Sequence, residues 1–293
     1  MERIVVGRSA TLTQTFTSDG VPTAPTGTPS VVVTRADGTV VTTSSVTAGG
    51  STGVFTVTIP ASQNQQLDKL IVTWTATVGG QPQEYDDTVE VAGGFLFTIA
   101  EMKELLADSR TSKTYTTAQI VRVRTRVEQA IEGDARGAGR AFVPRYARET
   151  ISVTSPSSTI LLRWPDVRAV RSITTTMAGV ATAYATADVA LASFDSSGVV
   201  HAPTRFYAGT GNVTVGYEHG MDTVPQEINL AALLLARAWL VSGPIDSRAL
   251  GFASSDGSGA SYGLATPGRG GSRFGLPDVD AIVDGFAMGS VIG

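Results

Sequence analysis

The sequence has no cysteine and only two histidines, His201 and His219, among its 293 residues. The absence of thiols excludes a disulfide framework, a thiolate metal site and a cysteine nucleophile. Neither histidine has another histidine nearby at the spacing of a zinc site, so we expect structural or surface roles for both. The sequence therefore predicts no metal ion.

Charged residues are also scarce, at 16% of the chain, whereas hydrophobic residues make up 42%. This composition is too apolar for a disordered protein, and a net charge of −4 argues against a general nucleic-acid coat. No apolar run reaches the roughly 18 residues of a membrane span, and residues 1–7 lack the apolar stretch of a signal peptide. We expect a protein made in the cytoplasm, with no membrane partner.

Motifs for catalysis or nucleotide binding lack their structural context. The Gly-x-Ser-x-Gly spelling occurs at 49–53 and 259–263, but neither stretch lies between an expected strand and an expected helix, as a nucleophile elbow requires. The glycine-rich stretch at 257–263 lacks the preceding strand and following helix that a dinucleotide site needs. Asp86 and Asp87 are neighbours in an expected strand, so they point to opposite faces and make a poor acid/base pair. We expect no catalytic residue and no cofactor.

The composition changes at about residues 93 and 250. Residues 94–250 carry sixteen basic and fourteen acidic side chains, whereas both flanking segments are net acidic. A chain of this length is long enough for about two domains. We expect an α+β, multidomain protein with a first domain at 1–93, a second at 94–250 and an extended Gly/Ser-rich arm at 251–293.

Residues 1–93 have the pattern of an all-β domain. Within residues 70–78 every second residue is apolar, the period of a half-buried strand, and Trp74 lies on that apolar face. Two valine-rich runs flank Asp37-Gly38, which predicts a hairpin. Short strands separated by Gly/Pro turns predict an immunoglobulin-like sandwich with Trp74 in its core.

Helical signals begin after Gly93-Gly94, where we expect a hinge. Thr98 and Glu101 fit a capping box, and an amphipathic helix capped by Thr117 should follow. A β section should precede a third helix that begins near Pro225. That helix is apolar nearly all round, so one face should pack on the core and another on a neighbouring subunit. The arm after it could form one short amphipathic turn at 279–286.

A basic cluster lies in and after the second helix. It can be a solvated helix surface paired with Glu128 and Glu132, or a contact with acidic neighbouring subunits or with passing DNA. We favour subunit contacts over DNA because no aromatic stacking residues alternate with the arginines. The cluster comprises Arg122, Arg124, Arg126, Arg136 and Arg140.

Five short motifs follow one another in a fixed order between residues 95 and 245. They are QAIE at 129–132, RAFVP at 140–144, ILLRWP at 160–165, VRSI at 170–173 and VTVGYEHG at 213–220, the last leading through VPQEI at 224–228 into an Ala/Leu helix. In this order and spacing, the segment resembles the head–tail adaptor (connector) proteins of long-tailed double-stranded-DNA phages.

The resemblance implies a non-enzymatic protein of the virion neck, made in the host cytoplasm. Its copies would form a homo-oligomeric ring, usually of twelve, between the portal protein and the tail-side stopper or connector. DNA would pass through the central channel without sequence-specific contacts. The arginine cluster would then contact subunits or the channel, and the arm after Gly251 would reach the portal or a neighbour. The expected ring-interface residues are Leu233, Leu234 and Trp239.

The first domain is an addition to the simple adaptor pattern, and contact with the capsid, outward decoration and adhesion are all open to it. The main alternative is a phage tail accessory or a surface- or carbohydrate-binding protein, which a glycan array would distinguish. An enzyme such as a hydrolase is a further alternative, but the sequence lacks converging polar residues with a base.

Overall fold

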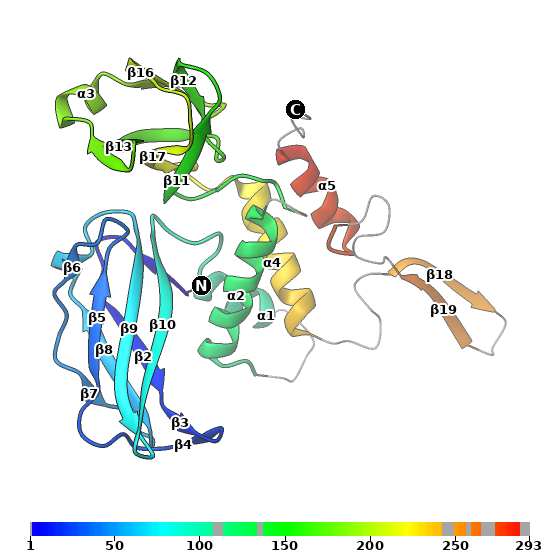
Figure 1. Cartoon of the computed structure of the whole chain (residues 1–293). Helices are drawn as coiled ribbons and strands as arrows, with labels where there is room; N and C mark the ends of the chain where they lie inside the picture. Colours follow the sequence, from blue (N-terminus) through cyan, green and yellow to red (C-terminus); the bar gives the residue numbers. More distant parts are fainter. Residues whose placement is uncertain are drawn as a thin grey trace. The chain divides into compact units, whose positions relative to one another are not determined.

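A computed structural model describes residues 2–107, 114–133, 137–241, 249–255, 259–264 and 273–287 (Figure 1). The protein is mixed α+β, and these residues form five α-helices and several small sheets. Contacts divide the chain into two compact units that alternate along the sequence. Unit 1 comprises Met1–Gly94, Pro144–Arg163 and Val167–His219, and unit 2 comprises Phe95–Val143, Trp164–Asp166 and Gly220–Gly293.

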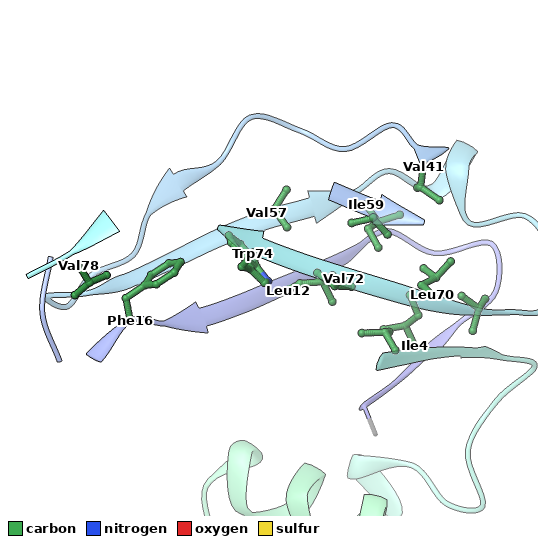
Figure 2. Close-up of a cluster of buried hydrophobic side chains, with 13 residues drawn as sticks. Ile4, Leu12, Phe16, Val41, Val57, Ile59, Leu70, Val72, Trp74 and Val78 are labelled. Carbon is green, nitrogen blue, oxygen red and sulfur yellow. The ribbon is translucent and has the colours of Figure 1, made fainter. Parts of the chain in front are cut away.

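Unit 1 begins with the N-terminal β body, residues 2–94, in which two sheets enclose one hydrophobic core (Figure 2). The larger sheet has the order β1-β10-β9-β5-β6 and the smaller one β2-β8-β7, with a β3–β4 hairpin beside them. The bounds are β1 Glu2–Val5, β2 Ala10–Thr15, β3 Thr17–Ser18, β4 Val21–Pro22, β5 Ser30–Thr34, β6 Val40–Val41, β7 Thr47–Ala48, β8 Val54–Ile59, a 3-10 helix Ala61–Gln63, β9 Asp68–Val78 and β10 Gln81–Ala92.

The alternation along β9 explains this core. Leu70, Val72 and Trp74 are each 1% exposed, so the inward face expected from the sequence is confirmed. Phe16, which lies between β2 and β3, meets the Trp74 ring edge-on, with the ring centroids 6.4 Å apart. The predicted β5–β6 hairpin is also present: Thr34 pairs with Val40 across a turn in which Gly38 has φ +89°.

The second β body, residues 144–163 and 167–219, completes unit 1. Its core strand is β17, on which Val213, Val215 and Tyr217 are fully buried. The sequence predicted strands here but missed the short helix α3. The sheets are β11-β17-β13-β14 and β12-β16-β15, with bounds β11 Arg145–Val153, β12 Ser157–Leu161, β13 Val167–Met177, β14 Val180–Ala183, α3 Thr186–Ala190, β15 Ser193–Phe194, β16 Val199–Phe206 and β17 Gly209–His219.

Gly93 is not a free hinge, contrary to expectation. Its N–H donates to the Pro144 carbonyl oxygen over 2.8 Å, beside the start of β11. A Cβ atom at Gly93 would lie 2.7 Å from Cδ of the Pro144 ring, which is closer than real contacts. The glycine is therefore required because the backbone passes directly against the proline.

Unit 2 is built around helix α4, which contacts α1, α2 and α5 (Figure 1). The capping box of Thr98 and Glu101 is confirmed, since each side chain accepts the other residue's backbone N–H. Helix α2 begins one residue earlier than expected, because Thr116 rather than Thr117 caps it in a box with Gln119. The helices are α1 Ile99–Ala107, α2 Thr117–Glu132, α4 Gln226–Leu240 and α5 Pro277–Phe286.

The described residues of the C-terminal segment, where we expect an extended arm, form a hairpin and a helix. Strands β18 (Ala249–Ser255) and β19 (Gly259–Leu264) pair as a hairpin. The sequence between them includes Asp256-Gly257, a hairpin signal that the Gly/Ser-rich composition obscures. The amphipathic turn expected at 279–286 is a ten-residue helix, α5, with Val279 and Val283 buried.

Candidate functional site

Helix α4 has one face inside unit 2 and one face that is incompletely covered. At 100° per residue, Leu230, Leu233 and Leu234 share a face opposite the buried one. Leu230 is 49% exposed, and Leu233 and Leu234 are half-buried. Unit 2 therefore leaves an apolar stripe, Leu230–Leu233–Leu234, partly open to contact. The residues of the buried face are Ile228, Ala231, Ala232, Leu235 and Ala236.

Trp239 lies near the end of α4 and is 37% exposed. The guanidinium carbon of Arg126, on α2, lies 4.9 Å from the centroid of the Trp239 ring, a cation–π distance. Arg122 is exposed one helical turn before Arg126. Helices α2 and α4 thus present arginine and tryptophan together, the residue types that most often dominate protein interfaces.

The other arginines of the predicted cluster are placed differently. Arg124 is buried, with its guanidinium carbon 3.3 Å from the centroid of the Phe95 ring. Arg140 pairs with Asp166 through two nitrogens, Nε to Oδ2 at 3.0 Å and Nη2 to Oδ1 at 2.7 Å. Arg136 lies outside the described residues. The structure therefore brings only Arg122 and Arg126 to one exposed helix face.

One interpretation of the arginine cluster was a solvated helix surface with Glu128 and Glu132 as pairing partners, but both glutamate side chains are buried. Glu128 Oε1 accepts the backbone N–H of Leu96 over 2.9 Å, and Glu132 Oε1 accepts that of Phe142 over 2.9 Å. These carboxylates satisfy N–H groups of the loop before α1 and of the loop after α2. The four-residue spacing from Arg124 through Glu128 to Glu132 was the available signal, since it sets all three on one face.

A charged cluster that sequence reasoning missed joins the two β bodies within unit 1. Glu90, on β10, accepts from Arg3 Nε over 2.9 Å and from Arg145 Nε on β11. Burial raises the pKa of Glu90, but the charges of Arg3 and Arg145 outweigh it and hold the pKa below its ordinary value. Arg171 binds both Glu218 and the Leu67 carbonyl oxygen, the latter over 2.6 Å. This cluster fastens the N-terminal β body to the second one.

His219 borders the cluster and is only 2% exposed. Burial lowers its pKa from 6.5 to about 3, and the charge of Arg145 adds to this, although Glu90 opposes it. Because the folded state holds the neutral imidazole, protonation favours unfolding. Stability is therefore complete above pH 6.5 and is lost as the pH falls toward 3. The other histidine, His201, is exposed on β16, with Nδ1 3.0 Å from Thr159 Oγ1.

We expect the free energy of unfolding to fall between pH 6.5 and 3 with a contribution from His219 of about 1.4 kcal/mol per pH unit. Denaturant unfolding at several pH values measures this slope, and His219→Asn should remove that contribution. His201→Asn is the matched control and should retain the full slope. Equal slopes in the native protein and His219→Asn would contradict the assignment.

Among the described residues, no group of three or more His, Cys, Asp or Glu residues could hold a metal ion. Across the same residues, no helix is long and apolar enough to span a membrane. The N-terminal β body has a cavity of about 470 Å³, and its lining includes Leu12, Trp74, Glu2 and Asp87.

No protein-family model matches the sequence, and no curated protein matches it. Among solved structures, it is similar to a chain in the neck of an empty GTA particle computed with C6 symmetry (18% identity, 68% of this chain, 92% of that chain, TM-score 0.45). A chain in the neck of a native GTA particle computed with C12 symmetry is also similar (18%, 67%, 90%, 0.42). A DUF4426 family protein from Pseudomonas aeruginosa PAO1 is more distant (13%, 29%, 66%, 0.24).

Proposed function

We propose that the chain is a structural, non-enzymatic subunit of a phage neck. In this proposal it is a head–tail adaptor, of which twelve copies close into a ring between the portal and the tail-side connector. DNA passes through the central channel without sequence-specific contacts. The ordered motifs across residues 95–245 support the adaptor class, and the surface of α2 and α4 supports the assembly.

The uncovered face of α4 is the observation that carries the proposal. Leu230 is 49% exposed on the face opposite the buried one, and Trp239, 37% exposed, lies near the end of the same helix on its other side. Burial of apolar surface stabilises association by about 25 cal/mol per Å², so a second copy is a favourable cover for this stripe. Leu233, Leu234 and Trp239 remain our proposed ring-interface residues, and Leu230 joins them.

Arg122 and Arg126 are the proposed charged contacts of the ring. Both are exposed on α2, and Arg126 is already held by the Trp239 ring. A guanidinium that is positioned in advance loses less side-chain freedom when it meets a carboxylate of the next subunit. Arg124 and Arg140 are held within unit 2, so we assign them to the subunit's own stability instead.

We propose an immunoglobulin-like class for residues 1–93, an adaptor role for 94–250 and a portal- or neighbour-binding role for 251–293. The contacts around Glu90 fix the N-terminal β body to the second β body. A body fastened in this way can transmit force, which suits contact with the capsid better than a loosely tethered decoration.

Microscopy of the full-length protein tests the proposal. We expect negative-stain images of the chain mixed with its portal to show rings seated on the portal, with Leu230→Asp reducing ring occupancy by about tenfold or more. Val40→Asp is the matched control, because Val40 is 65% exposed on β6 and receives the same charge. Particles with no ring of this chain at the neck, or equal losses in both variants, would contradict the proposal.

A further inference from the structure

Strand β14 is an exposed sheet edge without the usual protection. It ends the order β11-β17-β13-β14, so only one of its sides is paired. All four of its residues, Val180–Ala183, are exposed, and none is charged or proline. Natural proteins usually protect such edges with charges, prolines or very short strands, because free N–H and C=O groups bind other strands.

Most sheet edges of the N-terminal β body, by contrast, carry this protection. Strand β1 contains Glu2 and Arg3, and β6 and β7 have only two residues each. The edge strand β2 is uncharged, but the cavity beside it is lined by Glu2, Lys69 and Asp87. An incoming strand at β2 would therefore meet charges at the cavity, whereas β14 has no charge of its own.

The hairpin β18–β19 is a second edge of the same chemical kind. Its two strands carry no charged residue, and they pair with each other but with no other strand of the described chain. An isolated two-stranded hairpin is marginally stable in water, so a third strand would stabilise it. The described chain thus contains an uncharged hairpin with no third strand beside it. It also contains an uncharged sheet edge, β14, with no strand paired to its outer side.

We propose that the β18–β19 hairpin of one copy adds to β14 of a second copy, so that the four-stranded sheet continues across the subunit boundary. Backbone N–H and C=O groups on the two edges would satisfy each other. This inference rests on the proposed ring. A contact between two different surfaces can close into a ring of many copies, whereas β14 paired with β14 would give a two-fold dimer.

Cysteine cross-linking tests this contact directly, because the native sequence contains no cysteine. Paired strands bring Cα atoms to about 4.5–5.5 Å, within the range that a disulfide spans. Full-length Thr182→Cys would be mixed in equal amounts with Ser254→Cys on β18 or Ser261→Cys on β19. A disulfide between the two variants must then join different molecules. The samples are the purified protein at high concentration and the portal-bound ring.

We expect an oxidised, reducible dimer with one of the two hairpin variants, at least about tenfold above a control that pairs Thr182→Cys with Val21→Cys, which is 63% exposed elsewhere. Ala181→Lys in the Thr182→Cys chain should reduce the yield about tenfold, because it places a charge on the edge. Dimers of Thr182→Cys with itself alone, or control-level yields in both samples, would overturn the inference. Normal rings without the cross-link would overturn it and leave the adaptor proposal standing, whereas missing rings count against the adaptor proposal itself.

Discussion

Replacing Trp74 with alanine should destabilise the N-terminal β body by about 3–5 kcal/mol, the usual effect of removing a fully buried aromatic side chain. Trp74 is 1% exposed and lies between the two sheets (Figure 2). Phe16, which packs on it edge-on, also contacts Tyr85 and Phe55 at centroid distances of 5.6 and 5.9 Å. Loss of the indole would therefore leave a cavity in the middle of an aromatic cluster. Denaturant unfolding followed by circular dichroism measures the change.

Trp239→Ala is the matched control for this experiment. Its ring is 37% exposed and contacts Arg126, so its removal should reduce stability by about 1 kcal/mol or less, the scale of an exposed cation–π pair. The same substitution is thus made once in a buried strand and once near the end of a helix. The difference between the two losses measures the contribution of core packing, because the same indole ring is removed in both. A loss at Trp74 as small as that at Trp239 would show that the inward face of β9 is not a close-packed core.

Periodicity and local capping explain what the sequence predicted correctly. The alternation along β9, the Asp37-Gly38 turn and the Thr98–Glu101 box each depend on residues close together in the chain. Such patterns follow from the geometry of a strand, a turn or a helix end, so they are readable without a tertiary structure. The prediction of a third helix that begins near Pro225 was correct for the same reason.

The errors arose where distant segments decide the environment of a residue. A solvated surface was one interpretation of the helix that carries Glu128 and Glu132, but the loops at residues 96 and 142 bring N–H groups to these carboxylates. Gly93 was expected to be mobile, but Pro144 packs against it. In the candidate site, periodicity correctly indicated a helix that is apolar on more than one face. It could not show which apolar residues unit 2 would cover, and so it missed Leu230 as the most exposed of them.

Glu90 is another residue whose environment is decided by a distant segment, and its replacement is the second substitution with a large expected effect on stability. On β10 it follows the outward-facing positions of Glu84 and Asp86, so the strand pattern alone places it in solvent. Instead, Arg145 approaches from β11, and the Glu90 side chain is 6% exposed between Arg3 and Arg145. Glu90→Gln should reduce the free energy of unfolding by about 3–5 kcal/mol at pH 7, because two largely buried guanidinium groups lose their counter-charge.

The pH dependence of this loss distinguishes a charge effect from a packing effect. The Glu90 pKa is held below its ordinary value of 4.5, since the two arginine charges exceed the opposing effect of burial. The carboxylate contribution is therefore complete above pH 4.5 and disappears as the pH falls through the lowered pKa. The difference between the native protein and Glu90→Gln should shrink over that range. Glu84→Gln, on the exposed part of the same strand, should change stability by less than about 0.5 kcal/mol throughout. A Glu90→Gln penalty that stays constant into acid would mean that Glu90 holds the two β bodies together by shape, and that its charge contributes nothing.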